Sequence, residues 1–99
     1  MSYLVSVSFD IKNGTPHDYR MIYEKLDKIG FKRSIMSSDN KLYNIPTTTT
    51  VVGEFSGENC AKIRDDLSTK VKKIYETLGL KGEFILVVGG DWAWAIRYT

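Results

Sequence analysis

The chain has 99 residues, the usual size of one domain, so its length excludes an arrangement of two independent cores. Hydrophobic residues make up 42% of the chain and charged residues 26%, which excludes an intrinsically disordered protein. The formal net charge of +2 is too small to indicate nucleic-acid binding by itself. The single cysteine excludes an internal disulfide, and we find neither a membrane-spanning run nor a secretory signal. We therefore expect one cytoplasmic domain over residues 1–99, with no membrane partner.

The first expected element is a strand over residues 3–11, because apolar and polar side chains alternate along much of it. One face is apolar throughout and carries Tyr3, Val5, Val7, Phe9 and Ile11. The opposite face carries Leu4, Ser6, Ser8 and Asp10. The strand therefore delivers one carboxylate, that of Asp10, at its far end.

A first helix is predicted after the polar loop 12–16, where Thr15 suits the N-cap and Pro16 the first helical position. Apolar residues then recur with helical spacing at Tyr19, Ile22, Tyr23, Leu26 and Ile29. Gly30 is well placed to end this helix.

Residues 31–36 and 42–55 read as the two arms of a hairpin, joined by the turn-forming residues 37–40. Pro46 cannot donate a backbone hydrogen bond, so it indicates an edge or a bulge near the start of the second arm. Residues 47–52 are all threonine or valine, and this β-branched run predicts a strand.

A second, longer helix is predicted to begin at Ser56 and Gly57 and to end at Gly79. Its apolar stripe consists of Cys60, Ile63, Leu67, Val71, Ile74 and Leu78. Because Cys60 falls in this stripe, we expect a buried, inert thiol rather than a nucleophile.

Residues 83–88 form a further expected strand, which is apolar on both faces and is therefore predicted to lie inside the sheet. Gly89 and Gly90 interrupt this run. After them, Trp92, Trp94, Ile96 and Tyr98 alternate with alanine and arginine, which predicts a short fifth strand with one bulky face.

The predicted order is strand, helix, strand, strand, helix, strand, with an extra C-terminal strand. This order indicates an α+β fold, a ferredoxin-like βαββαβ sandwich in which both helices cover one face of an antiparallel sheet. The other face would be bare, with Ser6 and Ser8 on the central strand near the strand that carries Trp92 and Trp94. We expect a second copy to cover it, which gives a homodimer with these four residues in the interface.

The sequence VSVSFD at residues 5–10, with this element order in this length, resembles the small ferredoxin-like CRISPR-associated Cas-two proteins. It is also similar to the antitoxin endoribonuclease of type V toxin–antitoxin systems. The resemblance implies a metal-dependent endoribonuclease or a nucleic-acid-binding dimer in which Asp10 of each subunit meets its symmetry mate. Two carboxylates at that distance repel each other unless they share a proton or a divalent cation such as Mg²⁺. Arg20 and Arg33 stand near the places where the family carries arginines.

Each candidate site residue also has a purely structural interpretation. Asp10 is a candidate catalytic residue and metal ligand, because a metal-bound water is a strong nucleophile near neutral pH, but a strand-end aspartate also caps loops. Ser37 and Ser38 could contact a phosphate backbone, together with Arg20 and Arg33, or serve only as a turn.

Trp92 and Trp94 allow two interpretations, stacking on a nucleic-acid base or packing in a dimer interface, and the sequence favours the interface. Three hypotheses about function stay open. The first is a protein that binds RNA or DNA and cleaves RNA, of CRISPR-associated or toxin–antitoxin type. The second is a non-catalytic homodimer of a phage or mobile element that binds another protein. The third is a small-molecule sensor, with Gly89 and Gly90 as its only indication.

Overall fold

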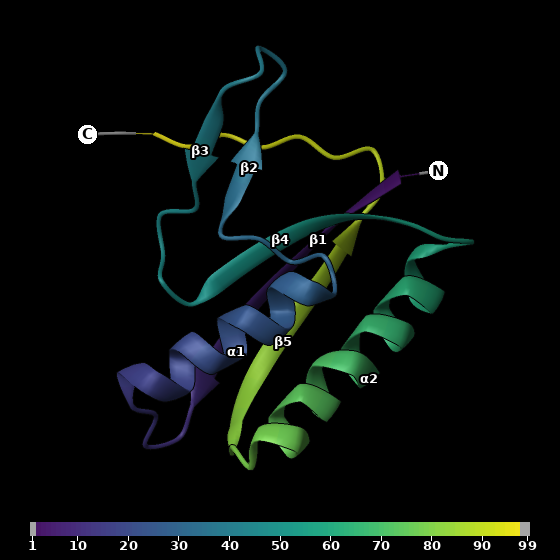
Figure 1. Ribbon diagram of the computed structural model, residues 1–99. Helices are drawn as coiled ribbons and strands as arrows, with labels where there is room; N and C mark the ends of the chain where they lie inside the picture. The colour runs from purple at the N-terminus through teal and green to yellow at the C-terminus, as the bar shows by residue number, and fades with distance from the viewer. Residues whose placement is uncertain (1, 98–99) are drawn as a thin grey trace.

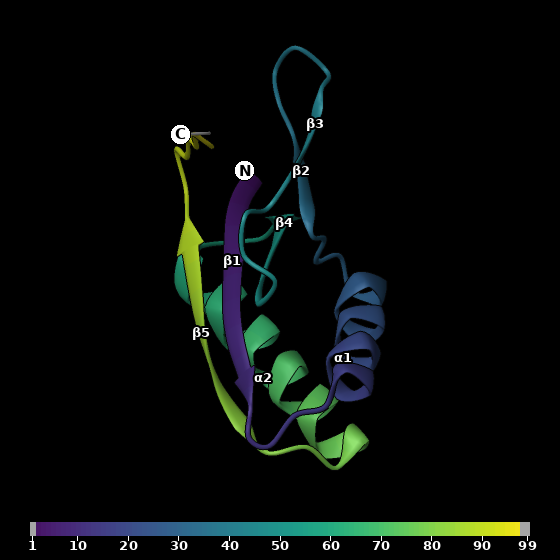
Figure 2. The ribbon, with the colours of Figure 1, turned by 90° about the vertical axis from the view of Figure 1, so that its left-hand side faces the viewer.

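A three-stranded antiparallel sheet organises the molecule, and its central strand is β1 (Ser2–Ile11). The computed structural model describes residues 2–97 (Figure 1). The other elements are α1 (Pro16–Lys28), β2 (Ser34–Met36), β3 (Leu42–Asn44), β4 (Thr50–Ser56), α2 (Cys60–Leu78) and β5 (Gly82–Gly89). Strands β4 and β5 flank β1, and Figure 2 shows both helices on one side of the sheet. The α+β class, the central position of β1 and the one-sided helices agree with the prediction.

The core lies between this sheet and the two helices. The predicted apolar face of β1 is buried along its whole length, and it packs against residues of α1 and α2. The buried helix residues are Ile22 and Leu26 of α1 and Ile63, Leu67, Val71 and Tyr75 of α2. Because every second residue of β1 enters the core, Ser6, Ser8 and Asp10 point to the opposite side of the sheet.

Helix α1 begins and ends where its sequence predicts. The Thr15 hydroxyl accepts the Asp18 backbone N–H at 3.1 Å, and the Asp18 carboxylate accepts the Thr15 N–H at 3.0 Å, a reciprocal capping box. Gly30 follows the helix with φ of +105°, a conformation that residues with a Cβ rarely adopt.

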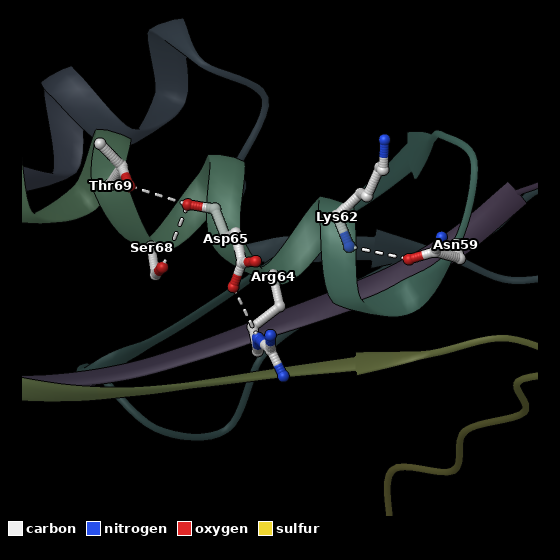
Figure 3. Close-up of polar contacts among 6 residues, drawn as sticks. All are labelled: Asn59, Lys62, Arg64, Asp65, Ser68 and Thr69. Atoms are coloured by element: carbon white, nitrogen blue, oxygen red, sulfur yellow. Dashed lines mark hydrogen bonds and ion pairs between the residues drawn. The ribbon is translucent and has the colours of Figure 1, made fainter.

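Helix α2 begins later than predicted. Its N-cap is Asn59, whose side-chain oxygen accepts the Lys62 backbone N–H at 2.9 Å (Figure 3). Cys60 therefore occupies the first helical position and is exposed, so the expectation of a buried thiol is wrong. The packed stripe starts only one turn later, at Ile63, which is buried.

The predicted second arm of the hairpin is divided into two strands. Strand β3 pairs with β2, and β4 pairs with β1, while residues 45–49 between them belong to no strand. Pro46 lies in this break, since it cannot donate a ladder hydrogen bond. The small β2–β3 sheet is linked to the main sheet by the Lys32–Val52 bridge, with N···O distances of 2.7 and 2.8 Å.

Strand β5 is at the edge of the sheet in the described chain, next to β1, and not inside it as predicted. Its two apolar faces have different environments. Phe84, Leu86 and Val88 pack against the core, whereas Ile85 and Val87 are 63% and 55% exposed on the other face.

The predicted C-terminal strand does not form in the part of the chain that is described. Residues 91–97 belong to no helix or strand, and Tyr98 lies outside the described residues. Asp91, with φ of +43°, redirects the chain after β5, and Trp94 then packs edge-on against Tyr43 of β3, 5.9 Å between ring centroids. None of the helices in residues 2–97 is long and apolar enough to cross a membrane.

Candidate active site at the end of strand β1

Asp10 lies exposed at the end of the central strand, on the sheet face that no helix covers. Directly opposite it in the β1–β5 ladder is Glu83, so the two carboxylates share one face of the sheet. Both residues line a shallow surface depression together with Ser8, Thr49 and Ile85. The structure therefore gives Asp10 an acidic neighbour.

A tyrosine from α1 fixes the Asp10 side chain. The Tyr19 hydroxyl donates to Asp10 Oδ1 at 3.2 Å and accepts the backbone N–H of Ile11 at the same distance. One carboxylate oxygen is therefore held by a partly buried side chain, which leaves Oδ2 for another ligand. A carboxylate held in this way loses less rotamer entropy when it binds a ligand.

A second tyrosine, from α2, fixes the backbone at the same place. The Tyr75 hydroxyl donates to the Asp10 carbonyl at 2.7 Å and lies 3.5 Å from the Glu83 carbonyl. Burial raises the pKa of the Tyr75 hydroxyl to about 12, and the neighbouring Tyr19 and Asp10 act in the same direction. The hydroxyl is therefore protonated at neutral pH and tied to the two strand ends that carry the carboxylates.

Lys12 and Lys81 lie just beyond the acidic pair, where β1 ends and β5 begins. The backbone N–H of Lys12 donates to the Lys81 carbonyl at 2.7 Å, one step beyond the pair formed by Ile11 and Gly82. Lys12 and Lys81 line a second depression with Asp10, Gly82 and Glu83. The end of the β1–β5 ladder thus carries two carboxylates and two ammonium groups close together.

The uncovered face of the sheet continues from Asp10 along β1. Ser8 shares a 2.9 Å hydrogen bond with Thr50 of β4, and Ser6 lies opposite Val87. Ser6 and Ser8 therefore lie on the face where the sequence predicts a dimer interface. Trp92 and Trp94 belong to the segment after β5, and Trp94 already packs against its own β3.

The predicted nucleic-acid contacts lie on different parts of the fold. Arg33 stacks on the Tyr23 ring, 4.2 Å from its centroid, and Arg20 is exposed on α1. Ser37 and Ser38 lie in the turn between β2 and β3. This turn and the end of β1 are at opposite ends of the molecule (Figure 1). One protomer therefore does not combine these serines with Asp10 in one site.

The basic residues of α2 do not form an uninterrupted positive surface. Arg64 pairs with Asp65 at 2.9 Å, Lys62 with Glu58 at 3.1 Å, and Lys70 with Asp66 at 3.2 Å. Figure 3 shows the first of these pairs, with the Asp65 carbonyl accepting from Ser68 and Thr69. This helix face is a mixed, solvated surface, which is a weak candidate for binding phosphates.

The carboxylates at the end of β1 are of the ligand type that magnesium takes. Mg²⁺ prefers oxygen ligands and is often held by one or two carboxylates while it keeps several waters. Asp10 and Glu83 supply two such carboxylates. Within residues 2–97 no group of three or more histidine, cysteine or acidic residues could hold a metal, so one protomer offers no third protein ligand of these types here.

Comparisons of the chain with protein-family models, with curated proteins and with solved structures found no match. The resemblance to Cas-two and antitoxin endoribonucleases therefore remains a prediction.

Sequence reasoning named Asp10, whose role stays a prediction, but did not name Glu83, Lys81 or the two tyrosines as candidate site residues. Tyr19 and Tyr75 were hidden because each lies on the core side of its helix, where an aromatic residue usually serves packing alone. Glu83 could have been found from the topology, since the last strand of a ferredoxin-like sheet runs antiparallel to the first. The start of one strand then lies beside the end of the other.

Proposed function

We propose that the chain is a ferredoxin-like homodimer that binds RNA and cleaves it as a magnesium-dependent endoribonuclease, with Asp10 as the catalytic residue. The observation that carries the proposal is the position of Asp10 beside Glu83 on the uncovered face of the sheet. The carboxylate is exposed, it is oriented by Tyr19, and it borders an apolar surface that can hold a second subunit.

The dimer is supported by the exposed apolar residues of the same face. Ile85 and Val87 are more than half exposed although they belong to a regular strand next to the core. A second copy related by a two-fold axis would cover this face and add its own Asp10 and Glu83 to the same interface. Ser6 and Ser8 are small enough to allow close approach of two sheets.

The chain's own residues have distinct tasks in the proposed reaction. Asp10 and Glu83 would hold Mg²⁺, which when bound lowers the pKa of a coordinated water and neutralises charge on the scissile phosphate. Tyr19 orients the Asp10 carboxylate, and Tyr75 holds the β1 and β5 backbones at the spacing that both carboxylates need. These contacts provide the preorganisation on which electrostatic catalysis depends.

The test is to incubate purified protein with labelled single- and double-stranded RNA and DNA, with Mg²⁺ or with a chelator. We expect Mg²⁺-dependent cutting of RNA that is lost in Asp10→Asn, a change that keeps the shape of the side chain. Asp91→Asn is the matched control, because Asp91 is exposed, lies beyond the other end of β5, and has a φ of +43° that asparagine tolerates. Cutting that survives Asp10→Asn would sink the proposed site.

A second candidate function is a non-catalytic homodimer that binds another protein. It is favoured by the β2–β3 hairpin, where Met36 and Leu42 are 54% and 63% exposed. Trp92 and Trp94 line a depression beside Met36, and tryptophan is enriched in protein interfaces. Absence of both RNA cutting and RNA binding in the experiment above would favour this function.

A further inference from the structure

Like charges meet at the end of the β1–β5 ladder and again just beyond it. Asp10 faces Glu83 in the ladder, and beyond the last pair, Ile11 and Gly82, the Lys12 N–H donates to the Lys81 carbonyl. Like charges directly opposite in a ladder destabilise the pairing, and exchanging the two residues of one strand would turn both repulsions into attractions. The arrangement is thus the less stable of two that use the same four residues.

Ion pairs between these lysines and these carboxylates do not explain the arrangement. Within residues 2–97, neither Lys12 nor Lys81 lies within 4.0 Å of a carboxylate oxygen, whereas four other basic residues do form such ion pairs. The four side chains nevertheless border one depression. The acidic pair and the basic pair are therefore both available to ligands.

We propose that Lys12 and Lys81 form an anion site for the phosphodiester backbone of single-stranded RNA, next to the cation site of Asp10 and Glu83. This inference rests on the proposed function and names how the site holds its substrate. A phosphate between the two ammonium groups removes their repulsion, as a divalent cation does for the carboxylates. Lysine supplies a mobile point charge with three donors, which suits a backbone that is bound without sequence preference.

Binding is measured by fluorescence anisotropy with a 2′-O-methyl RNA oligonucleotide, which resists cleavage, in the presence of Mg²⁺. We expect Lys12→Ala with Lys81→Ala to weaken binding about 25-fold at 0.1 M salt and to reduce the salt slope by about 1.4, the loss of two phosphate contacts. Lys12→Arg with Lys81→Arg should keep most of the affinity. The control is Lys72→Ala with Lys73→Ala, two exposed lysines of α2, because it lowers the net charge by the same amount.

A charge exchange tests the arrangement rather than the total charge. Lys81→Glu with Glu83→Lys keeps the net charge of +2 and places unlike charges opposite each other. We expect this variant to unfold at a higher temperature and to lose RNA binding. Binding as tight as that of the unchanged protein would overturn the inference, and so would equal losses in the lysine pair and in the α2 control.

The two proposals can fail separately. If the unchanged protein binds no RNA, the proposed function and this inference both fail. If it binds and cuts RNA, and Asp10→Asn abolishes cutting while the lysine variant binds normally, the function stands and the anion site alone is wrong.

Discussion

Tyr75 shows how one side chain links the fold to the candidate site. Its ring is buried in the core with the other buried residues of α2, while its hydroxyl reaches the backbone carbonyls of Asp10 and Glu83. A hydroxyl in this position must be satisfied, because an unpaired buried polar group destabilises the folded state by about 1 to 3 kcal/mol. The same bond therefore stabilises the core and positions the carboxylates.

The raised pKa of Tyr75 predicts how stability depends on alkaline pH. The folded-state pKa of about 12 exceeds the ordinary value of 10.0, so the unfolded chain loses this proton first. The contribution is complete below pH 10 and is lost as the pH rises towards 12, by about 1 to 2 kcal/mol in the free energy of unfolding. Urea unfolding of the protein and of Tyr75→Phe between pH 9 and about 12 measures it. The free energy of unfolding should fall less with pH in Tyr75→Phe. An equal fall in both proteins would contradict the raised pKa of Tyr75.

At the level of elements, the approach of β5 to β1 depends on a glycine at the start of β5. A Cβ built at Gly82 would lie 2.0 Å from the carbonyl oxygen of Asp10 and 3.0 Å from the Tyr75 ring. Any side chain there must push the two strands apart next to the pair formed by Asp10 and Glu83, so the spacing of the candidate site depends on this residue.

We therefore predict that Gly82→Ala destabilises the protein by about 2 kcal/mol, the usual cost of overpacking. Gly89→Ala is the matched control at the other end of the same strand, because a Cβ there meets no atom within 4 Å. It should leave stability unchanged or raise it by about 0.5 kcal/mol, since alanine restricts the unfolded chain. Thermal unfolding of both variants checks this, and similar melting temperatures would count against the close approach.

The elements themselves were largely predictable, since periodicity and caps are local signals. Thr15 and Gly30 mark α1 correctly, and the alternation in β1 identifies its buried face. The errors arise where tertiary structure decides. The two apolar faces of β5 suggested an internal strand, although one of them is uncovered in the protomer.

The candidate site was less predictable than the fold. Asp10 could be named because it ends a strand with a distinctive sequence. Glu83 and Lys81 join it only through the register of two strands more than 70 residues apart, counted from residue 10 to residue 83. The sequence around Glu83 and Lys81 does not distinguish these two residues from the other charged residues of the surface.

For the whole molecule, the dimer is the prediction on which the proposed mechanism depends. We expect sedimentation velocity to find a dimer at micromolar concentration and Ile85→Lys to be a monomer, because a charge in the interface core is costly to desolvate. Leu42→Lys is the matched control, since Leu42 and Ile85 are both 63% exposed but Leu42 is on the β2–β3 hairpin. A monomeric unchanged protein would argue against a site completed by two subunits.

The link between the β2–β3 hairpin and the rest of the molecule has a consequence for dynamics. The Lys32–Val52 bridge and the contact of Trp94 with Tyr43 join the hairpin to the rest of the molecule, while Met36 and Leu42 are open to solvent. Its amide protons should exchange through a local opening that leaves the main sheet intact, whereas those of β1 should require global unfolding. The carboxylate end of β1 would then keep its geometry while the hairpin opens.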